Sequence, residues 1–134
     1  MASILKVDDL RGNTAAGNIT ITSEGGAATQ SLQQGLIKHF VNFNGTGTPA
    51  VNDSLNHSSI TDNGTGDFTH TVTSAFNNSN YVPDGTCANS TSNPSSRYAS
   101  TVVVTTSTYR EQPRDQNTTL DLAYNTGFAM GDLA

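Results

Sequence analysis

Three histidines have the widest chemical range of any side chains in this sequence, and each falls inside a segment predicted to be a strand. They are His39, His57 and His70. Three copies of such a residue could meet on the threefold axis of an oligomer and bind a transition metal. However, the sequence has no His-X-His pair and none of the three has a cysteine nearby. We therefore expect solvated or hydrogen-bonded imidazoles, with no metal site and no cofactor.

The acidic residues are few and lie mostly in predicted turns. Residues 62–67 (DNGTGD) combine carboxylates with glycines, as a calcium-binding loop does. The Asn-Gly pair in this segment is also a preferred sequence for a tight hairpin turn. A hairpin explains the same residues without an ion, and it is the interpretation that we favour.

Tyrosine and arginine side chains in the last third of the chain are candidate recognition residues. Planar amphipathic rings and forked guanidinium donors suit the binding of sugars and anionic surface polymers. The same residues also fit an alternative role in sheet packing and surface solvation. The candidate receptor-binding residues are Tyr98, Tyr109, Arg110 and Arg114.

Other features of the sequence exclude several classes of function. There is no nucleophile elbow, paired-carboxylate motif or phosphate-binding glycine loop, so we assign no catalytic residue and do not expect an enzyme. The net charge is −5 and the six basic residues are scattered, which argues against nucleic acid as a partner. The opening MASILKVDDL predicts neither a signal peptide nor membrane insertion, so we expect synthesis in the cytoplasm. Cys87 is alone, which excludes an internal disulfide framework.

The composition and turn spacing predict an all-β fold. Only 34% of residues are hydrophobic and 13% are charged, so the polarity comes from Ser, Thr, Asn and Gly, which suit wet-faced strands and tight turns. Alternating segments are expected at 36–43, 50–60, 67–76, 97–110 and 118–124. They predict an antiparallel β-sandwich, jelly-roll-like, over residues 36–134. We expect residues 84–96 to form a long exposed loop. The tail, residues 125–134, is unusually apolar for a chain end, and we expect it to pack onto another surface, which the sequence does not identify.

Residues 1–35 are predicted to form a separate N-terminal segment. Short extended pieces alternate here with Gly and Asn, and ITIT at 19–22 has no evident hairpin partner nearby. Residues 29–36 (TQSLQQGL) hold the best helix formers of the chain and predict a brief helical connector. Because the apolar content is low, burial against other chains would help to offset the cost of ordering. We therefore expect an extended segment for attachment and trimerisation.

Residues 40–82 (FVNFNGTGTPAVNDSLNHSSITDNGTGDFTHTVTSAFNNSNYV) resemble a domain that recurs near the ends of tail-fibre proteins of tailed bacteriophages, especially marine phages of cyanobacteria. The aromatic strand with FNGTG, the SITDNGTGDF hairpin and the closing NSNYV carry this resemblance. Residues 4–26 (ILKVDDLRGNTAAGNITITSEGG) are similar to the N-terminal parts of such proteins. Together these matches cover about the first two thirds of the chain.

The resemblance implies a virion structural protein: a short homotrimeric tail fibre or fibre-tip subunit with a C-terminal β-sandwich. Its expected partners are other virion proteins of the tail, baseplate, collar or capsid. Fibres of this kind often attach to the host, so a host surface glycan or outer-membrane component is a further expected partner. The alternative is a capsid, collar or baseplate decoration or assembly protein that binds no receptor.

Overall fold

The computed structural model describes residues 5–15, 19–23, 25–89 and 97–134, and the chain divides into two compact units, residues 1–36 and 37–134. The described residues form strands and turns with no helix, so the all-β prediction is confirmed. The predicted boundary, after residue 35, lies next to this division. The loop predicted for residues 84–96 is wrong over residues 84–88, which belong to a strand, β7 (Val82–Ala88), and its residues 90–96 lie outside the described residues.

The N-terminal unit contains one antiparallel pair of strands, β1 (Thr20–Thr22) and β2 (Thr29–Ser31). The ITIT segment therefore has a hairpin partner in its own chain, contrary to expectation. The helical connector predicted for residues 29–36 is also wrong, because its first residues pair as β2 and only a turn follows, with Gly35 N–H donating to the Ser31 carbonyl. Strand pairing satisfies these backbone groups in a segment where glycine limits a helix.

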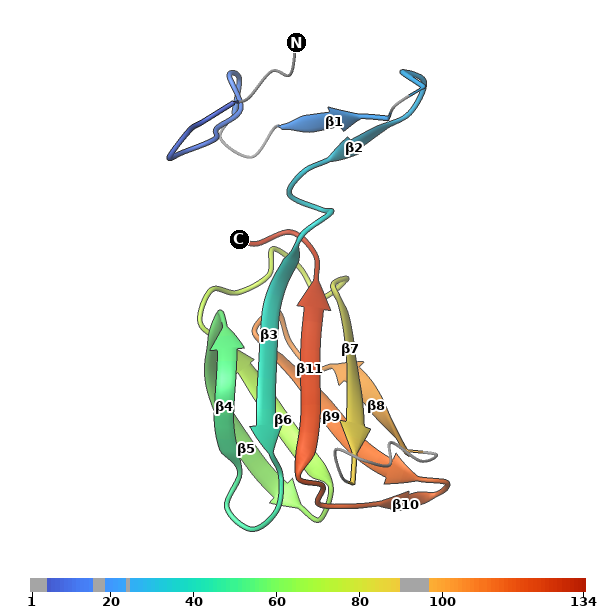
Figure 1. The fold of residues 1–134 in the computed structure, drawn as a ribbon. Coiled ribbons are helices and arrows are strands. Elements are labelled where there is room, and N and C mark those ends of the chain that lie inside the picture. The colour runs from blue at the N-terminus through green and yellow to red at the C-terminus, as the bar shows by residue number, and fades with distance from the viewer. Residues whose placement is uncertain (1–4, 16–18, 24, 90–96) are drawn as a thin grey trace. The chain divides into compact units, whose positions relative to one another are not determined.

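The second unit is an antiparallel β-sandwich (Figure 1). One sheet has the order β4-β3-β11-β7. In the other sheet, β6 lies between β5 and β9. Strand β9 pairs with β8 along one side; along its other side it pairs first with β6 and then, near its C-terminal end, with the short strand β10. The strands are β3 (Ile37–Asn44), β4 (Ala50–Leu55), β5 (His57–Gly64), β6 (Asp67–Val72), β7 (Val82–Ala88), β8 (Arg97–Val103), β9 (Thr108–Asp115), β10 (Thr118–Thr119) and β11 (Tyr124–Met130).

The strand order differs from the predicted jelly-roll arrangement. The pairs β3-β4, β5-β6 and β8-β9 are sequential hairpins that stay within one sheet. In a jelly roll, by contrast, two Greek keys carry the chain back and forth between the sheets. The predicted hairpin through residues 62–67 is confirmed, and Gly64 and Gly66 supply its positive φ angles of 131° and 60°.

Asn56 is the corner at which the chain leaves one sheet and enters the other. Its φ of 53° separates β4 from β5, which the sequence pattern had joined into one extended run. The side-chain amide accepts from the Ser74 backbone N–H at 2.7 Å and donates to the Ser74 carbonyl at 3.1 Å. Asparagine tolerates this left-handed conformation better than most residues, which explains its presence here.

The apolar core lies between the two sheets in two clusters. One contains Val41, Phe43 and Phe68. The other contains Val72, Phe76, Tyr81, Tyr109 and Ala129, with Leu133 of the C-terminal tail packed against it. The predicted packing of the tail is therefore confirmed, and the surface it packs on is its own domain, where residues 124–130 form β11, one of the two inner strands of their sheet.

Candidate binding surface and buried histidine cluster

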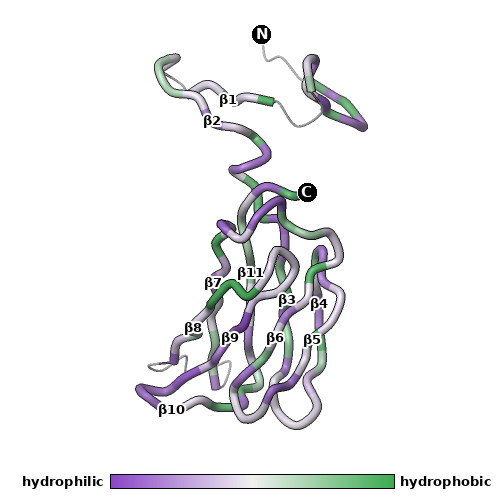
Figure 2. Tube along the Cα trace, turned by 180° about the vertical axis from the view of Figure 1, so that it is seen from behind, coloured by the Kyte–Doolittle hydropathy of each residue, from purple (hydrophilic) through white to green (hydrophobic). Residues whose placement is uncertain are grey.

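Three of the four candidate recognition residues lie together on the outer face of the β5-β6-β9-β8 sheet, which we call the binding face. Tyr98 of β8 pairs in register with Arg114 of β9, and Arg110 lies further along β9 opposite Val102. The strand period of two residues places Arg110, Gln112 and Arg114 on this same side of β9. Figure 2, which shows this sheet from behind, has β9 mainly in hydrophilic colours. The structure thus brings three of the four recognition candidates to one surface.

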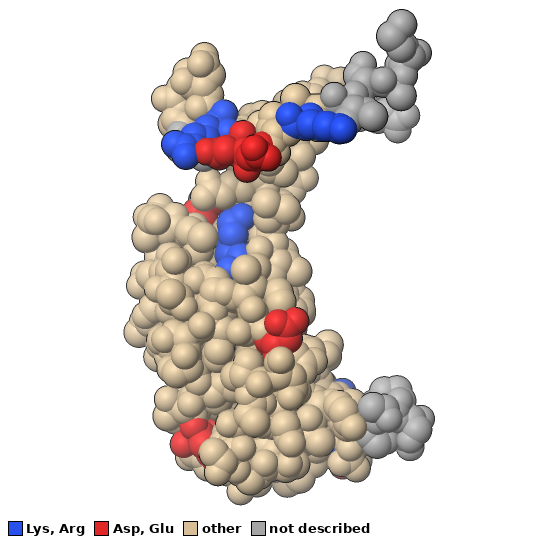
Figure 3. Space-filling model, turned by 60° about the vertical axis from the view of Figure 1, so that its left-hand side comes forward, with Lys and Arg blue, Asp and Glu red and all other residues tan. Residues whose placement is uncertain are grey.

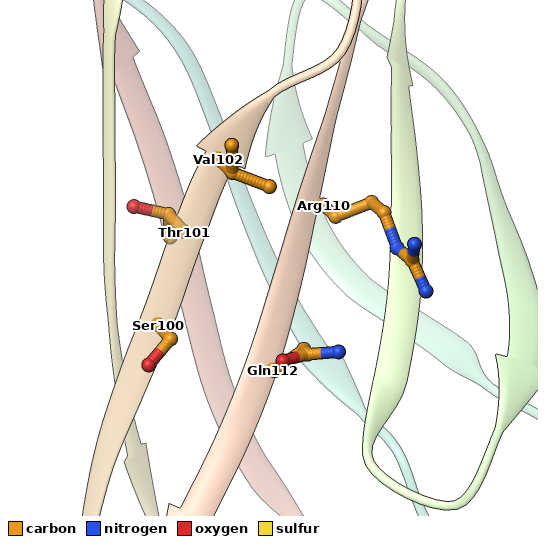
Figure 4. Close-up of a pocket in the computed structure, with 5 residues that line it drawn as sticks. All are labelled: Ser100, Thr101, Val102, Arg110 and Gln112. Atoms are coloured by element: carbon orange, nitrogen blue, oxygen red, sulfur yellow. The ribbon is translucent and has the colours of Figure 1, made fainter.

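A shallow hollow of about 200 Å³ lies on the binding face between β8 and β9 (Figure 4). Its lining combines hydroxyl, amide, guanidinium and aliphatic groups. The residues are Ser100, Thr101, Val102, Arg110 and Gln112. In Figure 4 the side chains of Arg110 and Gln112 project from β9 on the same side of the sheet. Such a mixture can hydrogen-bond a polar ligand while contacting its apolar edges.

Hydrogen bonds along the sheet hold the polar groups of the binding face in place. Arg110 forms a bidentate ion pair with Asp67 of β6, in which Nε lies 3.0 Å from Oδ1. Burial opposes ionisation of Asp67, but hydrogen bonds from Arg110, Gln112 and Asn63 outweigh it and lower the pKa of this carboxyl. Arg114 Nη2 donates to Gln112 Oε1 at 2.7 Å. The arginine forks are therefore oriented before any ligand arrives.

Tyr109 must be removed from the predicted surface. Its side chain is fully buried between the sheets, because it points inward from β9, whereas the flanking Thr108 and Arg110 point outward. By contrast, Tyr98 is exposed, and its hydroxyl donates to the Gln116 carbonyl. Only Tyr98 of the two candidate tyrosines can therefore present its ring to a ligand.

Tyr109 belongs instead to a second cluster of polar residues, buried between the two sheets. We call it the histidine cluster; it consists of His39 (β3), His57 (β5), His70 (β6), Tyr109 and Glu111 (β9). His39 Nε2 lies 3.2 Å from His57 Nδ1, so one of these nitrogens donates to the other. The Tyr109 hydroxyl lies 3.5 Å from His39 Nδ1. His70 Nε2 lies 3.3 Å from Glu111 Oε2, without the alignment of a hydrogen bond.

Burial keeps the histidine cluster uncharged at neutral pH. It lowers the pKa of His39 to about 3, helped by the two neighbouring imidazoles. It also lowers the pKa of His70 to about 3 and, together with His70, that of His57 to about 4. Burial raises the pKa of Glu111 to about 8, with a smaller contribution from Asp84. The cluster is therefore a neutral polar network rather than an ion pair.

Two glycines make room for this network. A Cβ on Gly127 of β11 would lie 2.3 Å from the Tyr109 hydroxyl and 2.5 Å from Glu111 Oε2. A Cβ on Gly85 of β7 would lie 3.2 Å from the Glu111 carboxyl. The β11 and β7 backbones therefore pass directly over the polar groups of β9, where only glycine fits.

The structure places the three histidines together within one chain, which the sequence did not predict. The expected hydrogen bonding is seen between His39 and His57, but the expectation is wrong for His70, which is fully buried and has no hydrogen-bond partner at either ring nitrogen. Within the described ranges, no group of three or more His, Cys, Asp or Glu is arranged to hold a metal ion. In the segment considered for calcium, Asp62 accepts from Gly64 N–H at 2.9 Å, as a hairpin turn requires. Cys87 is a free thiol whose pKa is raised by burial.

One signal for the cluster was visible in the sequence and another was not. His39 shares its strand face with Val41 and Phe43, and His70 shares its face with Phe68 and Val72, so both histidines follow the period of the core. Glu111 gave no such signal, because the EQP sequence around it indicated a turn.

The described part of the chain has no helix long and apolar enough to cross a membrane.

Comparison of the chain with protein-family models, with curated proteins and with solved structures gives no match.

Proposed function

We propose that this protein is a virion structural protein of a tailed bacteriophage, a short trimeric tail-fibre or fibre-tip subunit that attaches to a host surface glycan through the binding face. The observation that carries the attachment role is the ordered row of Arg110, Gln112 and Arg114 beside the exposed ring of Tyr98. The resemblance of residues 40–82 to phage fibre domains supports the virion setting. The proposed role is binding, not catalysis.

The groups on the binding face suit a sugar polymer. A pyranose ring has apolar C–H faces and equatorial hydroxyls, so it can stack on an aromatic ring and accept or donate hydrogen bonds at its edge. Tyr98 offers the ring, and Gln112 and Ser100 are aligned in register beside it. Arg110 is 42% exposed at its side chain and is already paired, so it adds a fixed donor for a hydroxyl or an acidic sugar.

The N-terminal unit supports the proposal of a trimer mounted on other virion proteins. None of its described residues is buried, and Leu5, Leu10 and Ile21 are each at least half exposed. A single two-stranded pair is marginally stable in water by itself. Packing of this unit against other copies or against a mounting protein would cover these side chains and order the segment.

The attachment role is tested by binding of the full chain to an array of bacterial O-antigen and capsular polysaccharides. The wild-type chain should bind a subset of them, and Tyr98→Ala and Gln112→Ala should each weaken binding at least about tenfold, as expected when a stacking or hydrogen-bonding hot spot is lost. Thr86→Ala, on the outer face of the other sheet, is the matched control. If wild type binds no polysaccharide and no bacterial cell, the attachment role is wrong.

The trimer is tested separately by native mass spectrometry of the full chain, whose single-chain mass is 14.0 kDa. A species of three chains is expected. A stable monomer at every concentration would refute this part of the proposal.

A further inference from the structure

Arg114 differs from the other arginines of the chain in having no carboxylate partner among the described residues. The other three form the pairs Arg11–Asp9, Arg97–Asp115 and Arg110–Asp67. Arg114 Nη2 donates instead to a neutral acceptor, Gln112 Oε1, at 2.7 Å, and its Nε is buried without a hydrogen-bond partner. The positive charge of Arg114 is therefore not neutralised by the described part of the protein.

Arg114 ends a network of hydrogen-bonded side chains that crosses the binding face. Gln112 accepts from Arg114 and donates to Asp67. Asp67 also accepts two hydrogen bonds from Arg110 and one from Asn63. These bonds use about the four lone-pair sites that a carboxylate offers, so Asp67 has no capacity left for a second guanidinium. The network thus holds two guanidinium groups and one carboxylate, which leaves a surplus of one positive charge.

This surplus is local, because the chain as a whole is acidic and sparsely charged. The net charge is −5, and 13% of the residues are charged. On the side of the sandwich that Figure 3 shows, charged side chains are few. Salt screens charges that lie more than about 8 Å apart at physiological ionic strength, so the groups nearest to Arg114 decide which ligand it attracts. An unpaired guanidinium favours an anion, and its planar fork matches a carboxylate.

Tyr98 lies beside Arg114 in a position that favours an acidic sugar over other anions. The two residues are register partners across β8 and β9, and such partners have Cβ atoms about 4.5–5.5 Å apart. Tyr98 is 45% exposed, and its ring is held by the hydrogen bond from its hydroxyl to the Gln116 carbonyl. In a uronic acid the carboxylate is attached directly to the pyranose ring. A sugar stacked on Tyr98 would therefore bring its carboxylate to Arg114, whereas a phosphodiester lies between sugars, further from a stacked ring.

The hollow between β8 and β9 suits a neutral sugar next to the acidic one. Ser100 and Gln112 are the register partners two residues along from Tyr98 and Arg114, a step of about 6.6 Å. The guanidinium that lines the hollow belongs to Arg110, which Asp67 already neutralises. The surplus charge therefore lies at the Arg114 end of the binding face.

We propose that Arg114 and Tyr98 form a subsite for a uronic acid, so that the binding face selects polysaccharides whose sugars carry carboxylates. Arg114 pairs with the carboxylate and Tyr98 stacks on the ring of the same sugar. This inference rests on the proposed attachment role and names the chemical class of its ligand.

The test measures binding of the full chain to the polysaccharide array before and after carboxyl reduction, which converts each uronic acid to its neutral sugar and leaves phosphate groups in place. Wild type should bind polysaccharides that contain uronic acids, and reduction should weaken this binding at least about tenfold, the loss expected with one charge-assisted hydrogen bond. Arg114→Gln should weaken binding to the untreated polysaccharides by a similar factor, and reduction should then have no further effect.

Two further variants separate the role of the fork from charge and from folding. Arg11→Gln removes the same charge from the N-terminal unit and should bind like wild type. Arg114→Lys keeps the charge without the fork, so it should still prefer the untreated polysaccharides, but less strongly than wild type. Circular dichroism spectra identical to wild type are required of each variant, and if Arg114→Gln misfolds, Arg114→Lys and the reduced polysaccharides decide the result.

The outcomes distinguish this inference from the attachment role. If wild type binds equally well before and after reduction, or binds only polysaccharides charged through phosphate, the uronic acid subsite is wrong and the attachment role stands. If Arg114→Gln prefers the untreated polysaccharides as strongly as wild type does, the assignment to Arg114 is wrong. If wild type binds no polysaccharide and no bacterial cell, both proposals are wrong.

Discussion

Lowering the pH from 7 to 5 is expected to weaken the sandwich by about 3 kcal/mol, because the histidine cluster must stay uncharged to remain buried. The pKa values of His39, His57 and His70 are lower in the folded chain than the ordinary 6.5. Between pH 6.5 and pH 3 the unfolded chain therefore binds protons that the folded chain does not, and stability falls as the pH falls. Linkage gives about 2 kcal/mol each for the fully buried His39 and His70 and about 1.5 kcal/mol for half-buried His57.

Glu111 acts in the opposite direction over the same interval. Its pKa is raised from 4.5 to about 8 in the folded chain, so its contribution to stability is fully present at low pH and is lost as the pH rises through this window. Lowering the pH from 7 to 5 therefore increases the contribution of Glu111 to the free energy of unfolding by about 2.5 kcal/mol. Subtracting this from the histidine total of about 5.5 kcal/mol leaves the net loss of about 3 kcal/mol, a large part of the 5–15 kcal/mol typical of a domain.

The assay is urea unfolding followed by far-ultraviolet circular dichroism and tyrosine fluorescence at pH 5, 6, 7 and 8. Protein concentration is held constant, because association also contributes to stability. Glu111→Gln removes the opposing group, so it should be more stable than wild type at pH 8 and lose about 5.5 kcal/mol between pH 7 and pH 5. Asp53→Asn, which neutralises an exposed carboxylate on the other sheet, should keep the wild-type profile.

Two results would refute this reasoning. A wild-type stability that is flat or rises from pH 7 to pH 5 would mean that the histidines are not kept neutral by burial. A loss of about 3–5 kcal/mol in Glu111→Gln at pH 7 would mean that His70 and Glu111 form a charged buried pair, since breaking such a pair leaves an uncompensated charge.

Other substitutions test the packing that surrounds the cluster. Gly127→Ala should cost at least about 3 kcal/mol in urea unfolding, because its Cβ would overlap the Tyr109 hydroxyl and Glu111 Oε2; Tyr109→Phe in the same chain should recover part of the loss, and no recovery would argue against this contact. Asn56→Ala should cost about 2 kcal/mol through the strained φ and two lost hydrogen bonds to Ser74; Asn56→Gly should cost less, and equal losses would contradict the role of φ. Phe68→Ala should cost about 3–5 kcal/mol as a cavity in the core, and a thermal midpoint within 2 °C of wild type would contradict its burial.

The sequence predicted the strands whose ends are marked by conventional turn residues. The segment 36–43 corresponds to β3, and the hairpin through residues 62–67 correctly joined β5 to β6. In both places Asn and Gly mark the turn and apolar residues alternate on the inward face. Local signals and tertiary packing agree there, so the pattern alone was sufficient.

The sequence failed where side chains replace glycine as the turn-forming element. Residues 97–110 were predicted as one strand, yet β8 ends at Val103 and β9 begins at Thr108. The turn between them is built by Thr105, whose hydroxyl accepts from Ser107 N–H at 3.1 Å and lies 2.8 Å from the Thr108 hydroxyl. Consecutive β-branched residues have a high strand propensity, so the sequence predicted a continuous strand where side-chain hydrogen bonds form a turn.

Local sequence signals also misplaced the turn predicted around Pro113 and the strand predicted at residues 118–124. Pro113 and its neighbours indicated a turn, but the proline lies within β9, where its buried ring packs inward. The segment 118–124 was predicted as the last long strand, but only Thr118–Thr119 pair, and β11 is formed by the tail instead. Gly127 lowers the strand propensity of that tail, and it is needed there because Tyr109 and Glu111 lie beneath it.

Several of the wrong predictions concern β9, the strand that contributes residues to both the binding face and the histidine cluster. Its outward residues Arg110, Gln112 and Arg114 form the binding face, and its inward residues Tyr109 and Glu111 complete the histidine cluster. Because inward and outward residues alternate along one backbone, β9 cannot shift to relieve charge in the core without moving the binding face. Ligand binding at the face should therefore weaken below about pH 6 in parallel with the loss of stability. Glu111→Gln is more stable than wild type at neutral pH and only approaches wild-type stability as the pH falls, so its binding should persist to a pH at least as low as in wild type, although residue 111 is fully buried and cannot itself contact the ligand. Polysaccharide binding that persists unchanged at a pH where the core has lost its stability would separate the two sides of β9 and contradict this coupling.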